Sequence, residues 1–409
     1  ALFIGSTLRT MYTLGQLALP VDDRVANYDR LWEAMRDTYP YFDIKPVDWQ
    51  AVREPYRERV AAAANEEEYF AVIAELLGTL QDSHTSLSYP YTIVTFQFAR
   101  LMVIDGQYVI RSVYGTDAIA VGEIVTAING EPVEARIAAL PADYRIGSTA
   151  ANAEALSAAA AMVLFGDETS MDVTVIGVDG TERTITLTLP EAAESNEANA
   201  PEITGAVLES GYGLIRIPSF GGSRAELVAE FDAALAALGD VPGIILDVRS
   251  NGGGNSLTAS EMAGRFMNQT FAYAQEFYRQ RMPDRFWLSD VTRVVSPRAP
   301  YDDRPLVILT DARVVSSAEE FVLMLVDSGR AVSIGRTTAG GTGNPIGFLL
   351  ADGGEASFST GDLHRVDGSR LEGAGIAPAI SVTWTLDDVR EGRDPDIAAA
   401  EAYLSGLGE

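Results

Sequence analysis

Strand and helix patterns alternate regularly between residues 212 and 338, and this alternation limits the possible folds more than any other feature of the sequence. The apolar runs YGLIRIPSF, GIILDVR, RPLVILTD and AVSIGRTT each predict a strand, and segments with helical periodicity separate them. Strands that are joined by helices pair in parallel through right-handed crossovers. This part of the chain therefore predicts an α/β core built on a parallel sheet.

The residues before this region begin with a helical part. Apolar residues recur at three- and four-residue steps from Tyr28 to Tyr39, and further amphipathic helices are predicted over Trp49–Ala64 and Glu66–Leu80. Three such helices form a small bundle. The pattern breaks at Gln81–Pro90, where small polar residues and a proline predict a loop.

From about residue 94 to residue 190 the pattern is that of a small mixed β domain. Turn dipeptides at Asp105–Gly106, Asn129–Gly130 and Asp179–Gly180 predict hairpins, and an alanine-rich helix is predicted over Thr149–Phe165. Residues 191–201 are acidic and small, which is typical of a linker. We therefore expect a helical bundle over residues 1–90, a β domain over 91–195 and the α/β core over 196–409.

Charge and apolar content narrow the classes of partner. The 409 residues include 30 basic and 58 acidic side chains, which gives a formal net charge of −28. Such a charge repels phosphate backbones and anionic membrane surfaces, so neither nucleic acid nor a lipid surface is expected as the main partner. No apolar run approaches the ~20 residues that a membrane span requires, and residues 1–20 lack the charged leader and continuous apolar core of a signal peptide. A soluble, acidic protein is expected.

Rare residue types restrict the chemistry further. Cysteine is absent, histidine occurs only as His84 and His364, and Lys45 is the single lysine. Thiol nucleophiles, cysteine–zinc sites and disulfides are therefore excluded. Chemistry that needs an imidazole must use one of the two histidines, and chemistry that needs an amine base must use Lys45. The histidines lie 280 positions apart without paired ligand spacing, so the sequence predicts no metal site and no cofactor.

Two segments at strand ends could form or stabilise a reaction intermediate. The glycine-rich Asp247–Asn255 (DVRSNGGGN) follows a buried strand, and its amides can form either a tight turn or an oxyanion hole. The second segment, TDARVVSSAEE, places Ser316 and Ser317 at the expected start of a helix. Ser316 and Glu319 match a capping box, but a serine at a strand–helix turn is also where many hydrolases place a nucleophile.

Three titratable residues lie in polar segments. His84, in QDSHTSL, is either a solvated or locally hydrogen-bonded residue or a general base. His364, in GDLHRVDGSR, has the surroundings of a surface residue. Glu372, in LEGAGIAP, is expected to be a solvated loop charge when it is considered alone.

Together these segments resemble the S41 serine peptidases, the family that contains the C-terminal processing proteases, the tricorn core and the retinoid-binding interphotoreceptor repeats. The matching elements are QDSHTSL, GIILDVRSNGGGN, VILTDARVVSSAEEF followed by SIGRTTAGG, and LEGAGIAP, in the family's order over about residues 81–380. The resemblance implies an α/β core of the ClpP/crotonase-like βαβ type. The segment GEIVTAINGEPV resembles a PDZ-type module, which implies a PDZ-like β domain; such modules add a peptide strand at a sheet edge.

The general base separates the branches of this family. In the processing-protease branch a lysine follows the nucleophile, just past the strand after its helix. This chain has Gly341 near that position and no lysine after Lys45, so a serine–lysine dyad is untenable. The tricorn-like branch uses a histidine, a small residue before it and a distant glutamate, and His84, Ser83 and Glu372 match these positions.

The resemblance also implies a role for each candidate residue. Ser316 is the nucleophile and His84 the general base, while Ser83 orients the imidazole. Glu372 holds Ser83 and stabilises the imidazolium. The oxyanion is expected to meet the amide of Ser317 and a glycine amide of the 252–254 turn, either Gly253 or Gly254.

The sequence thus predicts a serine peptidase that acts on peptide or protein substrates through a Ser–His–Ser–Glu relay and needs no cofactor. Two other functions stay open, a non-catalytic binder of apolar ligands on the same fold and an esterase that uses the same relay. By resemblance to exported family members, a periplasmic or extracellular location is expected, with a cytoplasmic one as the alternative. The sequence carries no signature of an oligomeric state.

Overall fold

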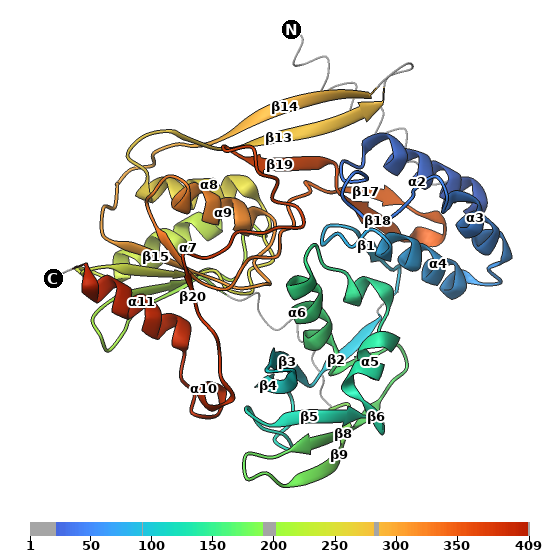
Figure 1. Ribbon diagram of the computed structural model, residues 1–409, viewed down its shortest axis with the longest axis horizontal. Coiled ribbons are helices and arrows are strands. Elements are labelled where there is room, and N and C mark those ends of the chain that lie inside the picture. The colour runs from blue at the N-terminus through green and yellow to red at the C-terminus, as the bar shows by residue number, and fades with distance from the viewer. Residues whose placement is uncertain (1–21, 92, 191–201, 282–285, 408–409) are drawn as a thin grey trace.

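The computed structural model describes residues 22–91, 93–190, 202–281 and 286–407, and its elements form three parts that meet near the centre of the molecule (Figure 1). Residues 1–20 and the linker predicted over 191–201 lie outside the described residues. Within these described ranges, no helix combines the length and the apolar character needed to cross a bilayer.

The first part is a six-stranded, mostly parallel sheet, which confirms the predicted α/β core. Its strands, in order across the sheet, are β10 (Thr204–Val207), β11 (Gly213–Arg216), β12 (Ile244–Asp247), β15 (Leu306–Thr310), β16 (Val332–Gly335) and β20 (Ile380–Ser381). Only the edge strand β10 runs antiparallel to its neighbour.

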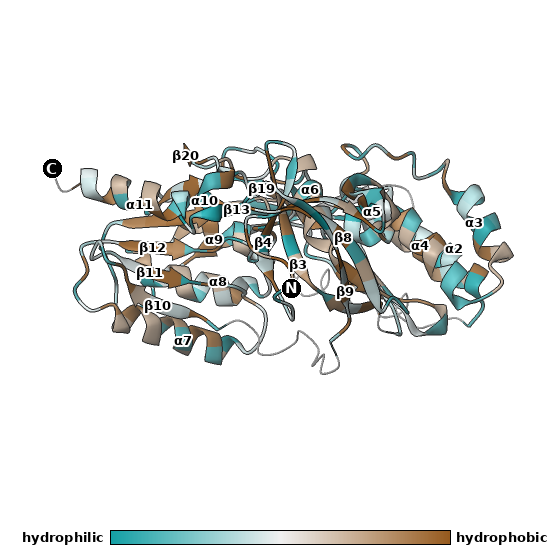
Figure 2. Ribbon diagram, turned by 90° about the horizontal axis from the view of Figure 1, so that it is seen from below, coloured by the Kyte–Doolittle hydropathy of each residue, from teal (hydrophilic) through white to brown (hydrophobic). Residues whose placement is uncertain are grey.

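Helices cover both faces of this sheet. Side chains of successive strand residues point to opposite sides, so one strand can pack against helices on both faces. The bounds are α7 (Arg224–Ala237), α8 (Ser256–Ala263), η2 (Gly264–Phe266), α9 (Ser317–Val326) and α11 (Pro395–Gly406). Ile244 and Leu246 pack with α7, α8 and α9, whereas Ile245 packs with α11. Figure 2 shows α7 and α11 on opposite sides of the apolar strands.

The second part contains the three predicted helices, α2 (Arg24–Thr38), α3 (Arg53–Ala62) and α4 (Glu66–Gly78). Their aromatic core also includes Phe348 and Phe358 from the C-terminal half of the chain. These two residues lie on β17 (Ile346–Leu349) and β18 (Glu355–Phe358), with η3 (Ala351–Gly353) between the strands. The predicted loop is partly wrong, since β1 (Ser86–Ser88) pairs with β18. Three residues are too few for a recognisable strand period.

The third part is the predicted mixed β region, and all three predicted turn dipeptides connect paired strands. Asp105–Gly106 and Asn129–Gly130 form two-residue turns, whereas Asp179–Gly180 lies in a longer turn over residues 177–181. Its elements are β2 (Val94–Gln97), β3 (Ala99–Ile104), β4 (Gln107–Val113), β5 (Ile124–Ile128), β6 (Glu131–Pro132), α5 (Val133–Ala139), η1 (Ala142–Arg145), α6 (Ala150–Ala160), β7 (Val163–Phe165), β8 (Ser170–Ile176) and β9 (Glu182–Thr188). The alanine-rich helix is shorter than predicted. It ends at Ala160, and the last predicted residues form β7, as β-branched and aromatic side chains favour.

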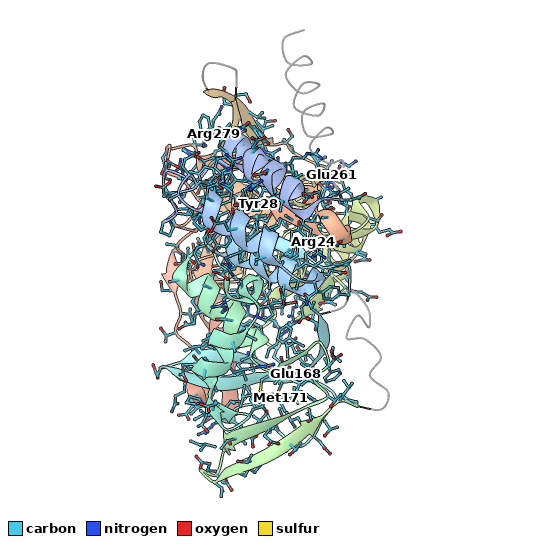
Figure 3. All side chains as sticks on the ribbon, turned by 90° about the vertical axis from the view of Figure 1, so that its right-hand side faces the viewer. Arg24, Tyr28, Glu168, Met171, Glu261 and Arg279 are labelled. Atoms are coloured by element: carbon cyan, nitrogen blue, oxygen red, sulfur yellow. The ribbon has the colours of Figure 1, made fainter. Side chains whose placement is uncertain are left out.

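Two further elements join the parts and were not predicted. A three-stranded sheet of β13 (Phe271–Arg281), β14 (Phe286–Val295) and β19 (Gly361–Arg365) extends from the core toward the helices. There Arg279 donates to the carbonyl of Tyr39 at 3.3 Å, and Figure 3 shows Arg279 beside the helical part. The short helix α10 (Leu386–Arg390) packs through Val389 on the β region.

Candidate active site

Ser316 occupies a strained position at the turn between β15 and α9. Its backbone has φ 63° and ψ −134°, and its side chain does not cap the helix. The capping box predicted for Ser316 and Glu319 is therefore wrong. Residues with a Cβ atom rarely adopt a positive φ, and such strained positions cluster at functional sites. The amide of Ser316 donates to the carbonyl of Gly341 at 2.8 Å, which fixes the turn.

Glu319 holds the segment opposite Ser316 instead of capping the helix. One carboxylate oxygen accepts from the amide of Gly340 and the other from the amide of Gly341, both at 2.8 Å. The Thr338 hydroxyl also donates to Glu319. Burial raises the pKa of Glu319 to about 7, although these hydrogen bonds favour the ionised form. The buried carboxyl group thus positions the segment that binds the Ser316 backbone.

The glycine turn after β12 closely approaches Ser316. A Cβ atom at Gly253 would lie 2.7 Å from the Cβ of Ser316 and 3.2 Å from the nitrogen of Ser317, and Gly253 has φ +90°. Only glycine fits this position without displacing a neighbour. The Gly253 amide donates to Asn251 Oδ1 at 2.8 Å, whereas the amides of Gly254 and Ser317 make no hydrogen bond within the described part of the chain. Of the three predicted oxyanion donors, Gly254 and Ser317 therefore have unused amides.

His84 lies in the loop between α4 and β1. Its amide donates to Asp82 Oδ1 at 2.9 Å, and its ring Nδ1 is buried without a hydrogen-bond partner. Burial lowers the pKa of His84, while the negative charges of Asp82 and Glu320 oppose that shift. This shift favours the neutral imidazole, which can accept a proton. No hydrogen bond joins His84 to Ser316 in the described residues.

Ser83 is held by the β region rather than by His84. Its hydroxyl donates to Asn152 Oδ1 at 2.8 Å and accepts from the amide of Ser148 at 2.9 Å. Its own amide donates to the Ser148 hydroxyl at 3.0 Å. Sequence reasoning missed Ser148 and Asn152, because a serine and an asparagine at the start of an alanine-rich helix carry no motif.

Glu372 is buried, with only 3% of its surface exposed, so its interpretation as a solvated loop charge is wrong. Its Oε1 accepts from Lys45 Nζ at 2.5 Å, while its Oε2 is buried without a hydrogen-bond partner. Burial raises the pKa of Glu372 to about 8; the charge of Asp82 adds to this shift, and Lys45 and the Ser148 hydroxyl counteract it. No motif around Lys45 predicts this contact with Glu372; in the sequence it is distinguished only as the single lysine.

Gly341 connects the Ser316 side of the site to Ser83. Its carbonyl accepts from the Ser316 amide, and a Cβ atom on it would lie 3.1 Å from the Cβ of Ser83. The same Cβ would lie 3.0 Å from both Ser148 Oγ and Val315 Cγ2. The neighbouring side chains thus leave no free space for the Cβ atom of a lysine at position 341.

The neighbouring glycines extend this connection to the other candidates. A Cβ atom at Gly343 would lie 3.2 Å from the Cβ of His84. The carbonyl of Gly340 accepts from the amide of Gly373, the residue after Glu372, at 2.8 Å. The four residues predicted to form the relay therefore lie around one segment, residues 340–343, but they do not form a continuous hydrogen-bonded chain in this structure.

A cavity of about 70 Å³ opens beside Ser316. Its walls include the amide-bearing Gly254 and the charged residues Glu276, Arg293 and Glu320. Glu276 pairs with Arg293 at 2.9 Å, and Glu320 accepts hydrogen bonds from two neighbouring hydroxyls, those of Ser256 and Tyr273. A mainly polar cavity next to a strained serine can hold part of a polar substrate.

His364 has partners of its own. It lies on β19, with 22% of its side chain exposed, and its Nε2 is 3.0 Å from Asp362 Oδ2. The half-buried ring also contacts Phe277 edge-on, so it is less exposed than the sequence suggested. In the part of the chain that the structure describes, no group of three or more histidine and acidic side chains could hold a metal ion.

Comparison with protein families identifies two matching segments. Residues 211–382 match the model of peptidase family S41, and residues 20–78 match that of the tricorn protease C1 domain. The first match includes the glycine turn, Ser316 and Glu372. The second match includes Lys45 and ends shortly before His84.

The chain is also similar to individual proteins, one of them by sequence and two by fold. The carboxyl-terminal-processing protease of Synechocystis sp. is 24% identical over 380 residues, which are 92% of this chain and 85% of the relative. Among solved structures, mature CPAF complexed with lactacystin has a TM-score of 0.73 at 14% identity, covering 94% of this chain and 97% of that one. The tricorn protease has a TM-score of 0.53 at 19% identity; the match covers 95% of this chain but 37% of the tricorn chain.

Proposed function

We propose that this chain is a serine-type peptidase of family S41, which hydrolyses peptide bonds with Ser316 as nucleophile and His84 as general base. The observation that carries this proposal is a pair of buried polar atoms without partners, His84 Nδ1 and Glu372 Oε2. Both residues lie around the segment that binds the backbone of the strained Ser316. Leaving such a group unpaired costs about 1–3 kcal/mol. A relay that hydrogen-bonds both atoms removes this cost.

Ser83 and Ser148 supply the hydroxyl groups for such a relay. Ser148 bonds to Ser83, and its hydroxyl also stabilises the ionised form of Glu372. We propose that the Ser83 side chain rotates from Asn152 to accept from His84 Nδ1 and donates its own proton toward Glu372. Hydrogen bonds of catalytic groups often tighten only when substrate is bound, so the open arrangement does not argue against the relay.

The proposed reaction is acyl transfer in two steps. Ser316 Oγ attacks the carbonyl carbon of the peptide bond while His84 Nε2 accepts the hydroxyl proton, and the imidazolium then protonates the leaving amine. Water then attacks the acyl-enzyme while His84 accepts its proton, and the imidazolium returns a proton to Ser316 Oγ as the acid is released. The amides of Gly254 and Ser317 stabilise the oxyanion, where one lost donor typically costs ~10²–10³-fold in rate.

We further propose that residues 93–190 act as a PDZ-like block that closes one side of this site, on a core of the ClpP/crotonase-like type. The support is that Asn152 Nδ2 donates to the carbonyl of Ala312 at 2.7 Å, in addition to the bonds with Ser83. The parallel strand–helix order of the central sheet agrees with the core assignment. Movement of α6 is then expected to break the bonds that hold Ser83 away from His84.

The cavity beside Ser316 favours a peptidase over a binder of apolar ligands. Its charged walls, Glu276, Arg293 and Glu320, suit the amide and polar groups of a peptide, whereas an apolar ligand leaves them without solvent. An esterase can use the same relay. Turnover of a peptide library compared with that of p-nitrophenyl esters separates these two activities.

The relay is tested with a fluorophosphonate probe, which labels activated serines. We expect labelling of the wild type at Ser316, identified by peptide mapping, and strongly reduced labelling of His84→Ala. Labelling that persists unchanged in His84→Ala, or no labelling of the folded wild type, contradicts the relay.

Gly253→Ala is expected to slow labelling of Ser316 by about 10²-fold or more, because the new methyl group must displace Ser316 or the neighbouring amide of Ser317. Gly252→Ala is the matched control, since a Cβ there meets no atom within 4 Å. Equal labelling rates of the two variants, measured on folded protein, would count against the assigned oxyanion turn.

We also propose a location outside the cytoplasm, on family resemblance alone. Fractionation of the native host with an antibody against the chain tests it, and recovery in the cytosolic fraction contradicts it.

A further inference from the structure

The single lysine of this chain lies beside Glu372. The side chain of Lys45 is only 5% exposed, and its Nζ is 2.5 Å from Glu372 Oε1. The same nitrogen donates to the carbonyl of Gln81 at 2.7 Å, just before the segment that carries Asp82, Ser83 and His84. Lys45 therefore contacts Glu372 and also the backbone just before the segment that carries Ser83 and His84, although the sequence excluded it as a base.

We propose that Lys45 is a positioning residue, which holds the Glu372 carboxylate in place and supplies the positive charge opposite it, so that Glu372 can act on His84. This inference rests on the proposed function. Among the described residues, Lys45 is the only basic side chain that pairs with Glu372. A buried carboxylate that loses its only cation becomes protonated or moves, because burial strongly disfavours an isolated charge.

The other groups that face Glu372 do not replace Lys45. Asp82 is negative and favours protonation of Glu372. Tyr39 and Tyr41 are buried, and burial together with the nearby carboxylates raises the pKa of each phenol well above its usual value, so both stay neutral. On the imidazole side, Asp82 and Glu320 are the charged groups that act on His84.

Lysine suits this task better than arginine. An ammonium group is a compact point charge with three donors, which here binds one carboxylate and one carbonyl in a narrow buried space. If Lys45 only joined the helical part to the core, a neutral residue of similar length could preserve the packing. The pH dependence of the reaction at Ser316 would then stay unchanged. The pH dependence therefore separates the two roles.

The test is the rate at which a fluorophosphonate labels Ser316 as a function of pH. In the proposed relay an ionised Glu372 speeds labelling, and burial raises its pKa to about 8, so wild-type labelling is expected to rise with pH through this range. Lys45 lowers that pKa, so Lys45→Met is expected to move the rise upward by about one pH unit or more, with about tenfold slower labelling at pH 7. Lys45→Arg keeps the charge and is expected to keep a profile closer to the wild type.

Further variants keep the proposal falsifiable. Lys45→Gln replaces Lys45→Met if the latter fails to fold by circular dichroism, and the same upward shift is expected. A Glu372→Gln variant has no carboxyl group to titrate at this position, so adding Lys45→Met should cause no additional shift in the pH profile of its slower, residual labelling. A folded Lys45→Met or Lys45→Gln with the wild-type profile, or an undiminished shift in the Glu372→Gln background, overturns the role of Lys45 while leaving the relay intact. A wild type that is not labelled at Ser316 instead overturns the proposed function.

Discussion

Ser316→Ala is expected to lower kcat/KM for peptide hydrolysis by at least about 10⁴-fold, because the variant retains the proposed oxyanion amides but lacks the proposed nucleophile. The fold should be unaffected, since the Ser316 side chain makes no capping bond and alanine keeps the same backbone constraints. The measurement is initial-rate kinetics on a peptide that the wild type cleaves, together with the thermal unfolding midpoint.

Ser317→Ala is the matched control for this variant. The Ser317 hydroxyl is buried without a hydrogen-bond partner, and the backbone amide proposed for the oxyanion hole remains after the substitution. We therefore expect Ser317→Ala to retain most of the activity. Activity that is lost in Ser317→Ala and kept in Ser316→Ala would move the nucleophile by one residue.

His84→Ala is expected to reduce kcat/KM by about 10⁴-fold, because Ser316 then has no base to accept its proton. Few alternatives can take over this role. The chain has one other histidine and one lysine, and Lys45 is already bound to Glu372.

His364→Ala is the control for the loss of an imidazole as such. His364 pairs with Asp362 on β19 and has no assigned part in the chemistry, so its removal should leave kcat/KM within a few-fold of the wild type. A large loss in His364→Ala together with a small loss in His84→Ala would exchange the roles of the two histidines.

The parts of the fold that were predictable are those with a periodic pattern. The strands of the central sheet are apolar on both faces because helices cover both, and this leaves the continuous runs that predicted β12 and β15. The sheet of β13, β14 and β19 was not predicted. One of its strands comes from a distant part of the chain, and its half-exposed strands carry many polar residues.

The residues of the candidate site also differ in whether a local sequence pattern marks them. Ser316, His84 and Glu372 each lie in a short local motif, so each could be selected from the sequence. Their partners could not. Ser83 binds Ser148 and Asn152 at separations of 65 and 69 residues, and Lys45 binds Glu372 across 327 residues. Contacts of this range leave no local pattern, because they exist only once separately folded elements pack together.

The sequence by itself predicted the alternation of strands and helices along the centre of the core and limited the candidate bases to two histidines and one lysine. Both follow from local properties, the period of apolar residues and the scarcity of histidine and lysine. Only the tertiary structure decided that Gly254 rather than Gly253 has an unused amide, that Glu372 is buried, and that the single lysine lies against it. Burial and long-range hydrogen bonding are properties of packed elements, and no single segment of the chain contains them.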